Sequence, residues 1–236
     1  YDMSDYGAPS SASVIVESGC SSLEFDGVND QISIQSSTLS TSFSSFSSLT
    51  IEAWIKWSDD NSLHYPIIQQ GWGTQDALFY LGLTGSDDSC GGSNTVGSLY
   101  FEFKSNPNDP SGCLTSDALA ENIWTHVAAV YDAGNIKLFI NGVQNAEQQL
   151  NTSSLSSINQ GDSYIGYSLA SGGTYFLGSI DSIHLSNTVL FSQDFTPNTH
   201  ITSNVDSIAI WNGDDELGTL LDSSGNGHHG TINGAT

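Results

Sequence analysis

Apolar and polar residues alternate along most of this chain, in short runs that glycine, asparagine, aspartate and serine interrupt. Such period-two runs predict β-strands, because successive side chains of a strand point to opposite faces of the sheet. The clearest is TIEAWIKW, residues 50–57. Its odd-numbered residues are apolar and are expected to share one face, whereas Glu52, Trp54 and Lys56 face the other way. Comparable runs lie at residues 66–70, 77–83, 99–103, 125–131, 136–140, 163–167, 175–185, 207–211 and 230–233.

Turn signals separate these runs, and helical periodicity is nearly absent. The strongest signal is Asn141-Gly142, because both residues tolerate a positive φ and favour a tight hairpin. About a dozen short strands joined by turns predict an all-β domain, built as an antiparallel sandwich of two sheets. A length of 236 residues suits one large β domain.

The charge balance excludes two classes of partner. The chain has 3 lysines and arginines against 26 acidic residues, a formal net charge of -23. Nucleic acids and anionic membranes are bound through basic side chains, so neither is an expected partner. No stretch of the sequence approaches the roughly 18 apolar residues of a membrane-spanning helix. We therefore expect neither nucleic-acid binding nor membrane insertion.

The cysteines and the N-terminal segment suggest a secreted protein. Cys90 and Cys113 lie in loop-like stretches on either side of an expected strand, so a disulfide between them is plausible and would imply an oxidising compartment. Cys20 is left over, and it could be free, buried or paired with another chain. The chain begins at Tyr1 without an apolar signal region, so we expect a processed protein or a fragment of a longer one. Residues 1–21 are less periodic and are expected to form an extension or an edge segment.

Several short motifs together carry a family resemblance. They are FDGVND, LTIEAWIKW, WTHVAAVYD, IKLFING, FLGSIDSIHL and DSSGNGHHGTINGA. In this combination the chain resembles laminin-G-like domains of the concanavalin A-like lectin/glucanase type, in their bacterial tandem-repeat form. The resemblance covers residues 23–236 and implies a jelly roll of two packed antiparallel sheets. It also implies an extracellular module that often binds Ca²⁺ and sometimes binds glycans.

The order of the motifs departs from the family. There, the DSSGNG-type strand precedes the FDG-type strand, whereas here it follows the whole sandwich. We therefore expect one domain over residues 22–236, in which residues 207–236 supply the family's first strand. Two outcomes are open: this segment completes its own sheet, or it pairs with a neighbouring copy and joins the chains into an array.

The glycine-rich turn at residues 222–227 is the first candidate metal site. Calcium prefers several oxygen ligands, and Asp222 and Asn226 present them within one tight turn. The resemblance implies that Asp181 lies close to this turn and shares the ion. Asp26 and Asp30 are additional candidates. The alternative is that these side chains only cap their own backbone, as Asp and Asn commonly do in turns.

A glycan site would need an exposed aromatic ring beside polar groups. Trp72 lies in a glycine-flanked loop and is the best candidate, unless it packs beneath that loop; Tyr65 and Tyr100 are weaker candidates. The other tryptophans fall within strands and are expected in the core, and His126 is expected to be packed. His228 and His229 would point to opposite faces of a strand, so they are not expected to share a metal.

Signatures of catalysis are missing from the sequence. Related glucanases place three acids as Glu-x-Asp-x-x-Glu, but the only Glu-x-Asp here is Glu24-Phe25-Asp26, and Asn29 stands at the third position. Signatures of serine hydrolases, zinc proteases and phosphate-binding loops are also lacking. We expect a non-catalytic extracellular adhesion module, stabilised by calcium, that binds a glycan or a surface protein. The alternative is a structural subunit that neighbouring copies extend through their terminal strands.

Overall fold

The computed structural model describes residues 22–35, 39, 45–71, 79–86, 95–103, 112–150, 155–156, 161–169, 173–216 and 218–236. These residues form strands and loops, as the alternating pattern predicts. The strands are β1 (Leu23–Asp26), β2 (Gln31–Ile34), β3 (Ser45–Phe46), β4 (Ser48–Trp57), β5 (His64–Gln70), β6 (Phe79–Thr84), β7 (Ser98–Phe103), β8 (Gly112–Ala118), β9 (Thr125–Asp132), β10 (Asn135–Ile140), β11 (Val143–Gln149), β12 (Leu155–Ser156), β13 (Ser163–Ile165), β14 (Tyr167–Ser168), β15 (Thr174–Tyr175), β16 (Leu177–Ser186), β17 (Ser207–Glu216), β18 (Thr219–Asp222) and β19 (Gly230–Asn233).

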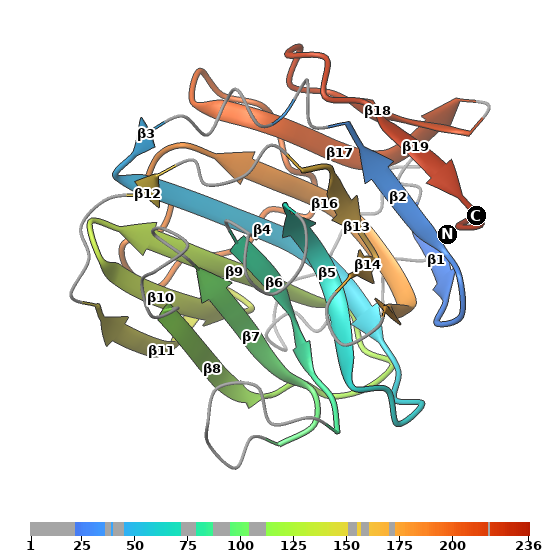
Figure 1. Cartoon of the computed structure of the whole chain (residues 1–236). Helices are drawn as coiled ribbons and strands as arrows, with labels where there is room; N and C mark the ends of the chain where they lie inside the picture. Colours follow the sequence, from blue (N-terminus) through green and yellow to red (C-terminus); the bar gives the residue numbers. More distant parts are fainter. Residues whose placement is uncertain are drawn as a thin grey trace.

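The main strands form two antiparallel layers that face each other (Figure 1). The first layer has the order β11-β10-β9-β4-β16, and both β1 and β17 pair with β16. The second has the order β19-β2-β13-β5-β6-β7-β8, and β18 connects β17 to β19, so the hydrogen-bonded ladder runs continuously from one layer to the other. The jelly-roll sandwich is therefore confirmed. Among the described residues there is no helix with the length and apolar character needed to span a bilayer.

The core lies between the two layers and follows the predicted alternation. The odd-numbered residues of β4, which are Ile51, Ala53, Ile55 and Trp57, are at most 2% exposed and belong to this core. Trp211 also lies there, as expected. Trp54 and Trp124 are buried too, but they lie outside this central cluster. The expectation that these tryptophans are buried is confirmed, and Trp54 lies on the outer side of a strand that is buried on both faces.

The C-terminal segment completes the sheet of its own chain. Strand β19 pairs with β2 from Gly230 opposite Ile34 to Asn233 opposite Gln31, and it also pairs with β18. Beyond the strand, Thr236 exchanges two backbone hydrogen bonds with Glu24, of 2.7 and 3.2 Å. Of the two outcomes that the sequence leaves open, the structure shows the first. The hypothesis that copies of the chain join into an array assumed that this strand pairs with a neighbouring copy, whereas here it pairs with β2 of its own chain.

The two outer edges of the ladder are tied to each other through side chains. The backbone N–H of Asp117, in β8, donates to Asn145 Oδ1 at 2.8 Å. In return, Asn145 Nδ2, in β11, donates to Asp117 Oδ2 at 3.1 Å. Exposed strand edges favour pairing with other chains, and this contact occupies one backbone N–H at the edge of β8.

A β-bulge in β16 decides which side chains reach the outer face of the first layer. Asp181 pairs with Trp54 and His184 with Glu52, so β16 contains one more residue than β4 between these two pairs. The extra residue is Ser182, whose φ is 51°. In a regular strand without a bulge, alternation from Asp181 onward would turn His184 toward the core. The bulge therefore places the imidazole beside Glu52.

Candidate functional site

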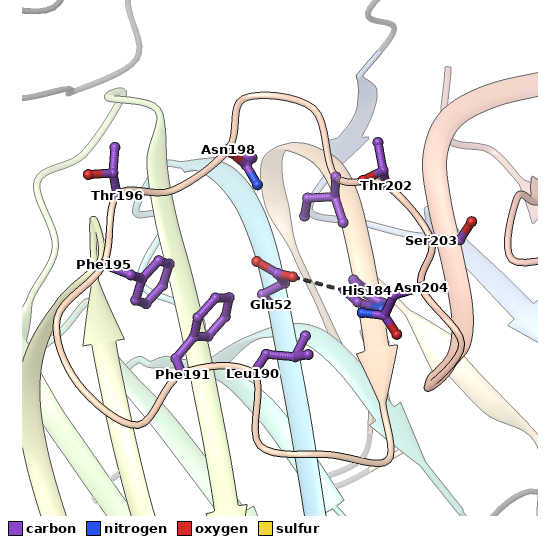
Figure 2. A pocket seen from close by; sticks show the side chains of 11 residues that line it. Glu52, His184, Leu190, Phe191, Phe195, Thr196, Asn198, Thr202, Ser203 and Asn204 are labelled. Atoms are coloured by element: carbon purple, nitrogen blue, oxygen red, sulfur yellow. Dashed lines mark hydrogen bonds and ion pairs between the residues drawn. The ribbon is translucent and has the colours of Figure 1, made fainter.

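A hollow lies on the outer face of the first layer, beneath the loop that connects β16 to β17. It is a cavity of about 280 Å³. Figure 2 shows the carboxylate of Glu52 on its floor, with Phe191 and Phe195 on one side and His184 on the other. The lining residues are Glu52, His184, Leu190, Phe191, Phe195, Thr196, Asn198, Ile201, Thr202, Ser203 and Asn204. The strands thus supply the floor, and the loop supplies the walls and the roof.

A chain of hydrogen bonds runs through the floor. Glu52 Oε1 lies 2.9 Å from His184 Nδ1, and Glu52 Oε2 lies 3.0 Å from His126 Nε2. His184 Nε2 lies 2.9 Å from the hydroxyl oxygen of Ser207. An ionised carboxylate only accepts hydrogen bonds, so each imidazole donates the N–H that faces it. This fixes both tautomers and leaves His184 Nε2 to accept the proton of Ser207.

Glu52 is ionised although it is buried. Burial raises the pKa of its carboxyl group, but the hydrogen bonds from His126 and His184 and the attraction of these two rings lower it, and the net pKa is below the ordinary 4.5. A buried carboxylate costs much less when it is hydrogen-bonded on both oxygens. Of the lining residues, Glu52 is the only one that carries a formal charge when the imidazoles are neutral.

Ser207, His184 and Glu52 have the hydrogen-bond order of a hydrolytic triad, but the serine is poorly placed for attack. Ser207 is 8% exposed, and it is not among the residues that line the cavity. Its hydroxyl oxygen already accepts the backbone N–H of Asn204 at 2.9 Å. The described geometry therefore assigns this serine to fastening the connecting loop onto the sheet.

Backbone contacts hold the roof in one position. Trp54 Nε1 donates to the carbonyl oxygen of Asn198 at 2.9 Å. The N–H of Phe195 donates to the carbonyl of Gly142 at 2.8 Å. A Cβ at Gly142 would lie 2.0 Å from the carbonyl oxygen of Phe195, so glycine is required for this close approach. The Asn141-Gly142 turn predicted from the sequence is present with φ of 49° and 78°, and it docks the loop.

The aromatic wall packs against the same network. The rings of Phe191 and Phe195 are stacked, with centroids 3.6 Å apart and planes at 4°. Phe195 also meets the ring of His126 edge-on at 5.6 Å. His126 is fully buried, as expected from the sequence, and its Nδ1 has no hydrogen-bond partner. The wall therefore covers one imidazole with apolar surface and leaves the other beside the cavity.

The predicted calcium turn is held by its own backbone. Asp222 Oδ1 accepts the N–H groups of Ile210 and Ser224, and Asp222 Oδ2 accepts the Ser224 hydroxyl and the N–H of His228, all at 2.9 to 3.0 Å. Burial raises the pKa of this carboxyl group, but these bonds lower it below its ordinary value. Asn226 turns its amide nitrogen toward the carbonyls of Ser207 and Ile208. The capping alternative thus describes the turn as the structure shows it.

The other predicted metal ligands lie elsewhere. Asp26 Oδ1 accepts the N–H groups of Val28 and Asn29, and Asp30 accepts the N–H of Asp26. This turn passes from β1 in one layer to β2 in the other, so it is not a hairpin. Asp181 is in β16, separated from the strand of Asp222 by β17.

The structure therefore does not gather the predicted ligands into one site. Among the described residues, no three His, Cys, Asp or Glu side chains lie close enough together to hold a metal ion. Calcium binding stays a prediction for this chain.

Two predicted glycan-binding aromatics are not exposed. Tyr65 is 0% exposed, and its hydroxyl donates to Asp59 and accepts the N–H of Asp60. Tyr100 is 5% exposed, and its hydroxyl donates to Glu102 at 2.6 Å. Neither can serve as an open platform, so these two predictions are wrong. Both tyrosines lie in strands, β5 and β7, where each buries its ring and satisfies its hydroxyl with a nearby carboxylate.

The remaining predictions concern Trp72, the cysteines and the histidine pair. Trp72 and Cys90 lie outside the described residues. Cys113, in β8, is disulfide-bonded, and Cys90 stays its predicted partner. His228 is buried and His229 is exposed, and both lie in the loop before β19 rather than in a strand.

Sequence reasoning did not assemble the Glu52 network, although signals for it exist. Glu52 is an acid in the most apolar strand, and a buried acid requires partners. The spacing of Ile180, Ile183 and Leu185 breaks the period of two, which is the sign of the bulge that turns His184 outward. What the sequence does not contain is the pairing of β4 with both β9 and β16, which brings the two histidines to one carboxylate.

The ionised Glu52 makes a testable contribution to acid stability. Because the folded state lowers its pKa, its contribution is present above about pH 4.5 and is lost as the pH falls through the folded value. We expect Glu52→Gln to be less stable than the wild type at pH 5, with a difference that shrinks toward pH 3. Urea unfolding across this range measures the difference.

An exposed acid provides the control for this series. Glu24→Gln, in β1, should follow the wild-type pH profile throughout. A Glu52→Gln difference that stays constant from pH 5 to pH 3 would show that Glu52 is not the titrating group.

Comparisons with known proteins place the chain in one family of folds. A family model described as the concanavalin A-like lectin/glucanases superfamily matches residues 26–195. A candidate carbohydrate-binding protein from Bacteroides ovatus ATCC 8483 is 22% identical, with a TM-score of 0.65, and the match covers 91% of this chain and 58% of that one. This chain therefore spans little more than half of that protein's length.

Two further structures share the fold at low identity. The CBM40 module of a Ruminococcus gnavus IT-sialidase, bound to α2,3-sialyllactose, is 20% identical with a TM-score of 0.54, over 72% of this chain and 92% of that one. A heptameric SAP-like pentraxin from Limulus polyphemus is 18% identical with a TM-score of 0.50, over 72% and 76%. No curated protein sequence matches this chain. At these identities the structural matches establish the fold.

Proposed function

Because this chain belongs to the concanavalin A-like lectin/glucanases superfamily, we propose that it is a non-catalytic carbohydrate-binding module whose site is the cavity beneath the loop between β16 and β17. The observation that carries the proposal is the composition of this cavity. Apolar rings form one wall, and a carboxylate, an imidazole, amides and hydroxyls form the rest. A sugar presents a similar division, with C–H groups on the faces of its ring and hydroxyls around the rim.

The dimensions suit a small ligand. Sites for small molecules commonly enclose roughly 300–1,000 Å³, and this cavity of about 280 Å³ lies at the lower end. We therefore expect it to hold one sugar residue, such as the end of a glycan chain. Asn198 reaches from the roof toward the floor, where its amide can bridge hydroxyls of the sugar (Figure 2).

The arrangement of acids supports binding rather than hydrolysis. Glycosidases generally flank the scissile bond with two carboxyl groups, one of which acts as an acid. Glu52 is the single carboxylate among the residues that line this cavity, and both of its oxygens are held by imidazoles. The module is therefore proposed to recognise a glycan, on a cell surface or on a surface protein, without cleaving it.

The disulfide at Cys113 supports an extracellular setting, because disulfides persist in oxidising compartments. Stabilisation by calcium is a separate part of the proposal, and its support is the resemblance of the 222–227 turn to the family's motif. The described cavity does not require a metal for the binding proposed above.

A substitution in the roof tests the proposed site. Asn198→Ala removes an amide that lines the cavity, while its anchoring contact to Trp54, made through the backbone, is retained. Loss of one hydrogen bond of about 1 kcal/mol should weaken glycan binding about fivefold. A glycan array identifies the ligand, and calorimetry then compares the variants.

Asn187→Ala is the matched control, because Asn187 is an exposed asparagine of the same loop and does not line the cavity. It should bind like the wild type. Equal affinity of both variants for the array ligand would place the binding site elsewhere, and an array without any signal would contradict the proposed function.

A further inference from the structure

The charge at the floor of the cavity identifies the kind of sugar that it takes. Resting on the proposed function, we infer that the cavity recognises an amino sugar through a protonated amine, which pairs with the carboxylate of Glu52. The inference depends on three features: an uncompensated negative charge, free acceptor capacity beside the cavity, and an aromatic wall next to it.

Apart from its two hydrogen-bonded histidines, Glu52 has no basic side chain beside it in the described part of the chain. Lys56 lies over the ring of Trp124, 5.3 Å from its centroid. Lys137 donates to the carbonyl of Ser192 and lies 3.8 Å from Glu147. Lys104 lies outside the described residues. The hydrogen bonds are those of neutral rings, because His126 Nδ1 is buried without an acceptor and His184 Nε2 accepts the Ser207 hydroxyl. The network of Glu52, His126 and His184 therefore carries one negative charge beside the cavity.

The other titratable groups around this network do not change that balance. Asp181, in β16, adds a second buried acid, and its Oδ1 accepts the Ser182 hydroxyl. In the roof, Asp194 accepts the N–H of Gln144, whereas His200 is exposed and Asp206 is half-buried. None of these groups hydrogen-bonds to Glu52, whose partners in the described part of the chain are the two imidazoles.

Glu52 has capacity for a further donor. A carboxylate offers about four acceptor positions, and each oxygen of Glu52 accepts a hydrogen bond from one imidazole. An ammonium group needs up to three acceptors, which the amide of Asn198 and the hydroxyl of Thr202 can complete. Phe191 lies beside Glu52 in Figure 2, and a cation next to an aromatic face gains further attraction.

Other sugar classes fit this floor less well. A sugar acid would bring a second negative charge, and the lining residues include neither lysine nor arginine. A neutral or N-acetylated sugar would leave the carboxylate desolvated without a counter-charge, which costs free energy. Of these sugar classes, only an amino sugar supplies a cation that forms an ion pair with the carboxylate of Glu52.

The sugar series that tests this inference needs only the full-length wild-type chain. Calorimetry or ligand-observed NMR at pH 7.0 compares glucosamine, glucose and N-acetylglucosamine. We expect glucosamine to bind at least tenfold more tightly than the other two. Equal binding of all three sugars overturns the inference and leaves the proposed function standing, whereas binding of none of them overturns the inference and leaves the glycan array to decide the proposed function.

A variant and a pH series assign the preference to the carboxylate. Glu52→Gln keeps the shape of the side chain and should abolish the preference for the amine. The control Asn187→Ala, outside the cavity, should retain it. If Glu52→Gln fails to fold, the wild type gives the same information. Raising the pH deprotonates the amine of glucosamine and removes its charge, so the preference of the wild type should fall at least threefold between pH 7.0 and 9.5. A preference that survives both changes overturns the assignment to Glu52.

Discussion

A chain that stops after His229 is expected to lose its cooperative unfolding transition. The missing residues include β19, which lies between β18 and β2. Ile232 of β19 packs against the core, and Ala235, beyond the strand, belongs to it. Its removal exposes the edges of two strands and uncovers part of the buried surface of Ile32, against which Gly230 packs closely. The loss is comparable to the whole stability of a domain, roughly 5–15 kcal/mol.

The control for this truncation is a circular permutant. It places residues 207–236 before residue 22 through a short glycine-rich linker, which is possible because Thr236 is hydrogen-bonded to Glu24. This variant restores the strand order of the family, and its thermal unfolding should resemble that of residues 22–236 in their natural order. Cooperative unfolding of the truncated chain, as a monomer in size-exclusion chromatography, would show that β19 does not complete the sheet.

Asp222→Ala is expected to lower the free energy of unfolding by about 3 kcal/mol or more, because it leaves buried N–H donors without acceptors. The carboxylate accepts the N–H groups of Ile210 and His228, and so joins β17 to the loop that leads into β19. Its charge strengthens these bonds. The pKa of Asp222 is lowered by them, so the contribution is present above its ordinary value, near pH 4, and is lost in stronger acid. Urea unfolding at pH 7 measures the change.

Two comparisons separate this structural role from a metal site. Asp26→Ala removes a carboxylate that caps an exposed turn, and it should cost much less than Asp222→Ala. Repeating the Asp222→Ala measurement with calcium and with EDTA shows whether an ion contributes. A cost that disappears in EDTA would assign the role of Asp222 to metal binding rather than to its hydrogen bonds.

Strands that bury one face are evident in the sequence, whereas polar edge strands are not. The alternation in β4 fixes which of its residues face the core, because an apolar side chain in every second position allows only one orientation. In contrast, β11 is Val143–Gln149 and β8 is Gly112–Ala118, which are largely polar segments. Each lies at an edge and is held by backbone pairing and by the Asp117–Asn145 contact. Neither interaction requires apolar and polar residues to alternate along the sequence.

The candidate site was harder to predict because each of its residues has an ordinary local explanation. Asp222 is a plausible metal ligand by its spacing, yet the same spacing suits a turn whose carboxylate accepts backbone N–H groups. Tyr65 and Tyr100 fall near loops, but their burial depends on neighbours from other strands. Local sequence thus identifies side chains that could bind a metal or a glycan, and their neighbours in the fold determine whether they instead accept backbone hydrogen bonds or pack in the core.

The sequence by itself determined the all-β class, the inward face of β4, the Asn141-Gly142 turn and the family. Each of these follows from local periodicity, from the backbone preference of one or two residues, or from short motifs. Only the tertiary structure decided that the C-terminal strand completes its own sheet. It also decided that β9, β4 and β16 lie side by side, so that His126, Glu52 and His184 share one network beneath the connecting loop. The physical reason is that strand pairing and loop docking join residues far apart in the chain, and their geometry is set by the whole sheet.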